Sequence, residues 1–124
     1  MAEKVRVLVI DDKKVIGDFF DFTLGYLGHK IAVVYNHDAA LDKLNKEDFD
    51  IVFLDIVMPD KDGVEILKDI RKVRPNLPVV MMSGFSVDEK KKEALSLGIV
   101  TCLQKPFDID SVLKVMREVL KRDI

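Results

Sequence analysis

The chain has 124 residues, of which 48% are hydrophobic and 34% are charged, and its net charge is −2. This length and composition suit one domain with an apolar core, so residues 1–124 are expected to form a single domain without a linker. The small net charge provides neither a basic surface for nucleic acid nor a polybasic membrane signal. The single cysteine, Cys102, excludes an internal disulfide and a thiolate metal cluster, which favours a reducing, cytoplasmic setting.

The chain begins with an apolar run at residues 5–10, which predicts a first strand. Residues 14–27 then carry apolar side chains at helical spacing and predict a helix. That helix should end at Gly28, because glycine is common just beyond a helix C-terminus. A second apolar run at residues 31–34 predicts another strand, and residues 39–44 predict a short second helix.

The third apolar run, residues 51–54, leads directly into Asp55. A carboxylate at the end of a buried strand is costly unless a charged or hydrogen-bonding group meets it. Asp62 can cap a third helix, which should stop before Pro75. Residues 79–82 predict the fourth strand.

The last part of the chain repeats the pattern. Ser86 and Glu89 form a capping box for a fourth helix that should end at Gly98. Residues 100–103 predict the fifth strand, and a fifth amphipathic helix begins near Asp108. The alternation of strands and helices predicts an α/β fold with an open, doubly wound parallel sheet, because five strands are too few for an eight-stranded barrel.

Polar side chains follow four of the five predicted strands. Asp11 and Asp12 follow the first, Asp55 the third, Ser83 the fourth and Lys105 the fifth. The carboxyl ends of parallel strands share one edge of the sheet, where ligands bind in such folds. We therefore expect these five side chains to gather there.

The chemistry of this set indicates a phosphoryl site. Clustered carboxylates repel one another, and Mg²⁺ relieves that repulsion and commonly shares its site with phosphate. Lys105 is a compact cation of the kind that binds phosphate, and the Ser83 hydroxyl can donate to a phosphoryl oxygen. Asp55 is the candidate nucleophile, because a carboxylate can itself accept a phosphoryl group.

Each feature also has an ordinary structural interpretation. Asp11 and Asp12 can cap a helix and interact with its dipole, Ser83 can belong to a turn, and Lys105 can be a solvated loop residue. Asp55 is hardest to explain in this way because it directly follows four apolar residues. Convergence at four strand ends favours the site.

Four segments together resemble the receiver domain of two-component response regulators, over essentially the whole chain. They are VLVIDD at 7–12, FLDIVMPDKDG at 53–63, MMSG at 81–84 and LQKPF at 103–107. The resemblance implies a flavodoxin-like (βα)5 fold with strand order 2-1-3-4-5. It also implies one receiver domain over residues 1–124, with no output domain in this chain.

The resemblance further implies that a sensor histidine kinase or phosphotransfer protein phosphorylates Asp55. Asp12 would bind Mg²⁺ (or Mn²⁺) directly, Asp11 largely through water, and Asp55 and the backbone carbonyl of Val57 would complete the ligands. Ser83 and Lys105 would contact the phosphoryl oxygens. A conformational change would then signal to a downstream protein partner, without direct contact with nucleic acid or membrane.

Two positions, Cys102 and Gly84, depart from the commoner receiver pattern. Gly84 follows Ser83 where alanine is common, and it should leave more open access to the phosphoryl group. Cys102 stands where an aromatic switch residue is frequent, and a small buried residue is expected there instead. Val57 and Phe85 occupy positions that influence hydrolysis in the family. Neither side chain can orient an attacking water by hydrogen bonding, so we expect a slowly hydrolysing aspartyl-phosphate.

The first predicted helix carries a second apolar stripe of Val15, Phe19, Phe22 and Tyr26, beside its core face. This stripe can be either a wide core face or a docking surface for the helical hairpin of the kinase. The docking candidates are Val15, Ile16 and Phe19, in the turns nearest Asp12. The histidines, His29 and His37, lack metal-ligand spacing and are expected in surface loops.

Two other functions remain open. One is a phosphatase or hydrolase that uses Asp55 as nucleophile, although Val57 occupies the place of a second acid/base and no cap insertion is visible. The other is a binding module that works without phosphorylation, which would be expected if the acidic residues or Lys105 were missing. We therefore expect no turnover of a separate substrate.

Overall fold

The computed structural model describes residues 4–58, 62–84, 88–99, 101–122 and 124, and the side chains of residues 88–91 lie outside that description. Within these residues, strands and helices alternate along the chain. The elements are β1 (Arg6–Ile10), α1 (Lys14–Tyr26), β2 (Lys30–Val34), α2 (His37–Lys46), β3 (Ile51–Asp55), α3 (Gly63–Val73), β4 (Val79–Ser83), α4 (Asp88–Ser96), β5 (Thr101–Gln104) and α5 (Ile109–Leu120).

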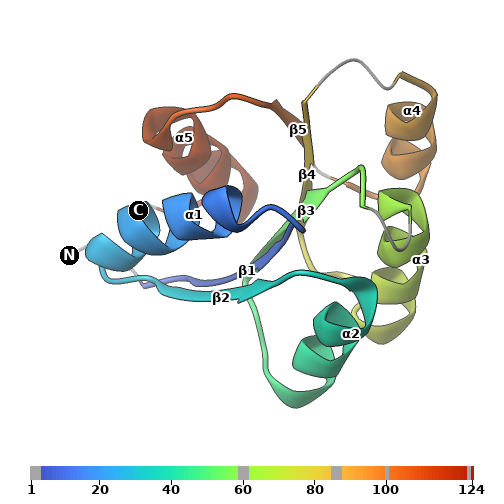
Figure 1. Cartoon of the computed structure of the whole chain (residues 1–124), viewed down its shortest axis with the longest axis horizontal. Coiled ribbons are helices and arrows are strands. Elements are labelled where there is room, and N and C mark those ends of the chain that lie inside the picture. Colours follow the sequence, from blue (N-terminus) through green and yellow to red (C-terminus); the bar gives the residue numbers. More distant parts are fainter. Residues whose placement is uncertain (1–3, 59–61, 85–87, 100, 123) are drawn as a thin grey trace.

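The strands form one parallel sheet in the order β2-β1-β3-β4-β5, which confirms the predicted fold. Helices α1 and α5 cover one face of the sheet, and α2, α3 and α4 cover the other (Figure 1). Every strand is parallel to its neighbours, so all carboxyl ends point to the same edge. That edge carries the loops that follow β1, β3, β4 and β5.

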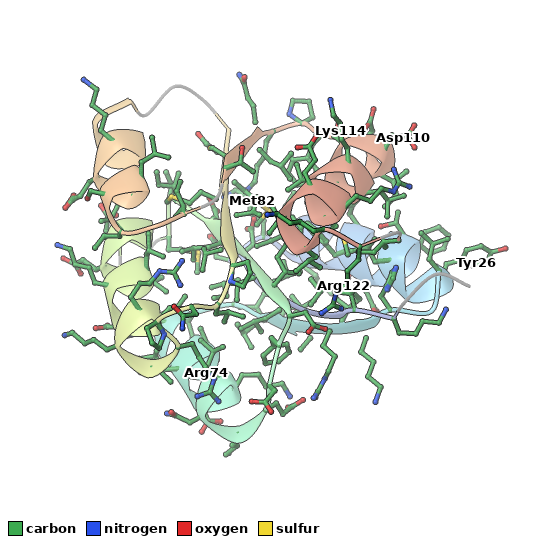
Figure 2. All side chains as sticks on the ribbon, turned by 180° about the vertical axis from the view of Figure 1, so that it is seen from behind. Tyr26, Arg74, Met82, Asp110, Lys114 and Arg122 are labelled. Carbon is green, nitrogen blue, oxygen red and sulfur yellow. The ribbon has the colours of Figure 1, made fainter. Side chains whose placement is uncertain are left out.

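Each face of the sheet has its own apolar core. The inner strands β3 and β4 are buried at every position, which explains why their sequences read as continuous apolar runs. Met82 on β4 lies in the middle of the molecule (Figure 2). Helices α1 and α5 bury one cluster, around Phe20, Phe53 and Met116. No helix among the described residues has the length and hydrophobicity needed to cross a membrane.

Local signals place most of the helix ends as predicted. Asp62 caps α3 by accepting a hydrogen bond from the Val64 N–H, and Asp108 caps α5 in the same way. Gly28 follows α1 with a φ of 92°, a conformation that favours glycine. The capping box predicted at Ser86 and Glu89 lies outside the described residues and side chains.

The prediction that both histidines lie in surface loops is wrong. His37 is the first residue of α2, which begins earlier than predicted because the Asn36 side chain caps it. Its Nε2 lies 2.7 Å from Asp69 Oδ2 on α3. His29 is buried, and its Nδ1 accepts a hydrogen bond from the Val5 N–H at 3.0 Å.

Arg71 on α3 joins two loops at the edge of the sheet opposite the carboxyl ends. Its guanidinium donates to the carbonyls of Leu77, Leu97 and Gly98, at 2.6, 2.8 and 3.0 Å. These carbonyls belong to the connection into β4 and to the end of α4. A single side chain therefore links α3, α4 and the start of β4.

Candidate functional site

The sheet register brings the three acidic candidates together. Ile10 pairs with Leu54, so the residues that follow them, Asp11 and Asp55, lie side by side at the carboxyl edge of the sheet. One carboxylate oxygen from each of Asp11, Asp12 and Asp55 lies within 4.8 Å of the others. Asp11 and Asp55 are buried, whereas Asp12 is partly exposed.

Both carboxylate oxygens of Asp11 accept hydrogen bonds. The Lys13 backbone N–H donates to Oδ1 at 2.9 Å, and Lys105 Nζ donates to Oδ2 at 2.8 Å. The Lys105 side chain is only 15% exposed, so this ion pair is largely removed from water. A buried ion pair with short contacts holds the ammonium in one position.

Asp55 is satisfied at only one oxygen. Its Oδ1 accepts a hydrogen bond from the Val57 N–H at 3.1 Å, whereas its buried Oδ2 has no hydrogen-bond partner. Two ammonium groups approach Oδ2 without bonding to it, Lys105 Nζ at 3.5 Å and Lys13 Nζ at 3.6 Å. An unsatisfied buried oxygen is uncommon, and it marks where a ligand would gain most.

The environment raises the pKa of Asp55 above its ordinary value. Burial is the largest cause, and the neighbouring Asp11 carboxylate adds to it. The Val57 N–H, Lys105 and Lys13 act in the opposite direction by stabilising the ionised form. A carboxylate with a raised pKa beside charged partners is typical of functional sites.

Ser83 and Lys105 come from the next two strands. Asp55 pairs with Met82, so Ser83 lies one residue beyond that partner at the end of β4, and it is buried. The Lys105 backbone N–H donates to the Ser83 carbonyl at 2.6 Å, which continues the β4–β5 pairing into the loop. The structure thus places all five predicted side chains at the carboxyl edge of the sheet.

Gly63 allows the loop after Asp55 to close tightly. A Cβ atom added at Gly63 would lie 2.6 Å from the Ile56 Cα and carbonyl oxygen, and 2.7 Å from the Asp55 carbonyl oxygen. These are backbone atoms, so they cannot move aside as a flexible side chain would. The glycine lets α3 begin directly against the end of β3 and so fixes the residues that follow Asp55.

The structure describes Cys102 and Gly84, which depart from the commoner receiver pattern, and Val57, one of the two positions expected to influence hydrolysis. Cys102 is half-buried against the core in β5, rather than fully buried as expected. The Val57 side chain is 40% exposed beside Asp55. Among the described residues, an added Cβ at Gly84 would meet no atom within 4 Å beyond its chain neighbours. Phe85 lies outside the described residues.

Sequence reasoning missed Lys13 as a member of the site. Its Nζ lies 3.4 Å from Asp12 Oδ1, and its side chain also approaches Asp55. Burial would lower its pKa, but the carboxylates of Asp55 and Asp12 outweigh burial and raise it. The available signal was the placement of a lysine directly after two acids that end a strand.

The second apolar stripe of α1 is largely exposed. Val15, Phe22 and Tyr26 are 69%, 80% and 87% exposed, so the core does not account for them. Tyr26 points away from the ribbon into solvent (Figure 2). Phe19 differs, because it is half-buried and its ring packs edge-on against the ring of Phe107, with 5.7 Å between the ring centroids. Ile16 is also half-buried.

The chain matches one protein family over most of its length. Residues 7–117 match the family model described as the response regulator receiver domain. Over 119 residues the chain is 35% identical to the transcriptional regulatory protein ZraR of Klebsiella oxytoca. That match covers 96% of this chain but 27% of ZraR, so the chain spans about a quarter of the length of this relative.

The fold also matches solved structures of other proteins over almost the whole of this chain. A CheY-like response regulator receiver domain protein from Methanospirillum hungatei JF-1 matches with a TM-score of 0.91 and 27% identity, covering 96% of this chain and 95% of that one. Chemotaxis protein CheY4 of Vibrio cholerae matches with a TM-score of 0.88 and 30% identity, covering 95% of this chain and 100% of CheY4. NtrX from Brucella abortus matches with a TM-score of 0.89 and 33% identity, covering 96% of this chain and 27% of NtrX.

Proposed function

The chain belongs to the response regulator receiver domain family of two-component systems, and we propose that Asp55 accepts a phosphoryl group from a sensor histidine kinase or phosphotransfer protein. The observation that carries the proposal is the buried Asp55 Oδ2. It has no hydrogen-bond donor, and the ammonium groups of Lys105 and Lys13 lie 3.5 and 3.6 Å from it. A nucleophilic oxygen needs a free lone pair and nearby positive charge, and Oδ2 has both.

The proposed transfer is a displacement at phosphorus. Asp55 Oδ2 forms a bond to the phosphorus atom while the bond from phosphorus to the donor imidazole nitrogen breaks, and that nitrogen takes the electron pair. The equatorial phosphoryl oxygens carry the developing charge. Lys105 would stabilise this charge from its position beside Oδ2, and Ser83 would donate its hydroxyl.

The donor set fits Mg²⁺ or Mn²⁺. Three carboxylates within reach of one ion, one of which has an unsatisfied oxygen, are hard oxygen ligands of the kind these cations prefer. The proposed ligands are Asp11, Asp12, Asp55 and the backbone carbonyl of Val57. When bound, the cation supplies positive charge that offsets the repulsion between the carboxylates and the incoming phosphoryl group.

We place the protein's role in signalling rather than in turnover of a separate substrate. The proposed site contains one nucleophile, and exposed Val57 stands where a hydrolase would need a second acid/base. We propose a cytoplasmic receiver unit over residues 1–124 that passes a conformational signal to a downstream protein. The relative ZraR is a transcriptional regulatory protein, but this chain spans only 27% of its length. We therefore propose no direct contact between this receiver unit and nucleic acid.

The test is phosphorylation by a small-molecule donor. Wild type and Asp55→Asn are incubated with acetyl phosphate, with Mg²⁺ or with a chelator, and their intact masses are measured. We expect one phosphoryl group on wild type in the presence of metal, and none on Asp55→Asn or with chelator. An adduct on Asp55→Asn would contradict the assignment of the acceptor, and an adduct with chelator would contradict the metal requirement.

A further inference from the structure

Lys13 touches the acidic site at three places. Its backbone N–H donates to Asp11 Oδ1 at 2.9 Å, and its Nζ lies 3.4 Å from Asp12 Oδ1 and 3.6 Å from Asp55 Oδ2. One residue therefore interacts with all three carboxylates. Its side chain is 55% exposed, so the ammonium group reaches the site from the solvent side.

The second cation of the site, Lys105, is held quite differently. Its side chain is 15% exposed and forms a 2.8 Å ion pair with Asp11, a carboxylate that is itself buried. Lys13 makes only longer contacts, and more than half of its side chain is in water. Of these two ammonium groups, Lys13 is the one that can move into water without breaking a short, buried ion pair, because its side chain is long and more than half exposed.

We propose that Lys13 is a built-in counter-cation that competes with a divalent metal ion for the carboxylates of Asp12 and Asp55. This inference rests on the proposed function, because it assumes that these carboxylates bind the metal. Without metal, the ammonium group balances part of their negative charge. Metal binding must displace it, so Lys13 weakens the affinity of the site for the metal and sets the metal concentration at which the site fills.

The size of the effect follows from simple electrostatics. At the dielectric constant of water, separating an ammonium group from a carboxylate about 4 Å away corresponds to about a fivefold change in affinity, and partial loss of the contacts with Asp12 and Asp55 together corresponds to about tenfold. The remaining exposure of Lys13 keeps the effect near this aqueous value. The effect also weakens with salt, because solvent-exposed charges are screened.

The test measures metal binding directly, with Mn²⁺ as the probe and its electron paramagnetic resonance signal as the measure of free ion. Wild type, Lys13→Gln, Lys13→Arg and Lys14→Gln are titrated at one fixed, low ionic strength. Lys14 is the matched control, because it is the next residue, its side chain is 80% exposed, and it pairs with Asp18 at 3.0 Å. We expect Lys13→Gln to bind Mn²⁺ about tenfold more tightly than wild type. Lys14→Gln and Lys13→Arg should stay close to wild type.

The other outcomes overturn the inference in distinguishable ways. Equal affinities of wild type and Lys13→Gln would overturn the role of Lys13 and leave the metal-dependent function intact. Equal tightening in Lys13→Gln and Lys14→Gln would assign the effect to net charge rather than to the position of Lys13. Absence of Mn²⁺ binding in wild type and in Lys13→Gln would overturn both this inference and the metal site of the proposed function.

Discussion

Asp55 differs from Asp11 in how its carboxylate is satisfied. Both oxygens of Asp11 accept short hydrogen bonds, from the Lys13 N–H and from Lys105 Nζ, so the Asp11 carboxylate is held in place. Asp55 has one bonded oxygen and one buried oxygen without a donor. Burial and the neighbouring Asp11 raise its pKa, because both disfavour the ionised carboxylate. This difference is why we assign chemistry to Asp55 and support to Asp11.

The residue Val57 should control how long the phosphoryl group survives. Its exposed side chain lies two residues beyond Asp55 and cannot orient a water molecule. Replacing it by Asn adds one hydrogen-bonding group, worth about 1 kcal/mol, which corresponds to roughly fivefold faster hydrolysis. The decay of phosphorylated wild type and Val57→Asn is followed by intact mass. Val57→Leu keeps the apolar cover and should decay like wild type, and equal decay of all three proteins would refute the prediction.

The buried residue His29 should make folding sensitive to acid. Burial, assisted by the positive charge of Lys4, lowers its pKa below the ordinary value of 6.5. The unfolded chain therefore takes up a proton first as the pH falls. The free energy of unfolding should be unaffected by His29 above about pH 6.5, should decrease below it, and should level off once the pH is below the folded pKa.

The control for this prediction is His29→Asn, whose side-chain oxygen can accept the Val5 N–H in place of Nδ1 but does not titrate in this range. Urea unfolding of both proteins is measured at several pH values between 7.5 and 5. The stability of wild type should fall more steeply than that of the variant. Parallel curves would show that His29 does not contribute to the acid sensitivity.

At the scale of elements, helix α1 presents two faces with different roles. One face contributes Phe20 and Leu24 to the core, whereas Val15, Phe22 and Tyr26 remain exposed. Near the last two, α1 and α5 enclose an open groove of about 330 Å³ lined by Phe22, Thr23, Tyr26, Leu27, Ile109 and Leu113. Val15 lies at the opposite end of the stripe, in the first turn of α1 after the acidic residues.

The docking prediction for α1 is best tested at Val15. Truncating Phe19 would also disturb its ring contacts with Phe20 and Phe107, so a loss of transfer there would be ambiguous. Placing a charge at Val15 should reduce phosphotransfer from a histidine kinase about tenfold or more, because burying an apolar side chain contributes about 1.5 to 3 kcal/mol. Phosphorylation of Val15→Asp by acetyl phosphate should match wild type.

Tyr26→Asp is the matched control, since Tyr26 is also largely exposed on the same stripe but lies at the far end of the helix. It should accept a phosphoryl group from the kinase like wild type. If Val15→Asp and Tyr26→Asp lose transfer equally, the docking surface extends over the whole stripe. If Val15→Asp transfers normally, Val15 is not part of the docking surface.

Much of each element could be predicted because local chemistry determines it. The strands β3 and β4 are buried on both faces, which requires uninterrupted apolar runs, and Asp62 and Asp108 cap helices with their own side chains. The start of α2 was placed too late, because Asn36 was not recognised as its cap. The burial of His29 depends on the backbone of Val5, which is 24 residues away, and no local pattern reveals such a contact.

In the molecule as a whole, the parallel sheet brings residues that are far apart in the sequence together in one site. Because every strand runs in the same direction, residues that follow β1, β3, β4 and β5 meet at one edge. The sequence therefore predicted which side chains would meet there. The sequence could not predict which carboxylate oxygens would be hydrogen-bonded. The surroundings of Asp55 Oδ2 depend on the positions of two lysine side chains, which come from different loops.

Attachment of the phosphoryl group to Asp55 is tested by chemical mapping of the modified residue. The protein is phosphorylated with acetyl phosphate and Mg²⁺, and borohydride then reduces the acyl phosphate to a stable alcohol. Peptide mass spectrometry locates the resulting homoserine. We expect homoserine at position 55 and unchanged aspartate at positions 11, 12 and 62. Homoserine at any of these three positions, with Asp55 unchanged, would contradict this assignment.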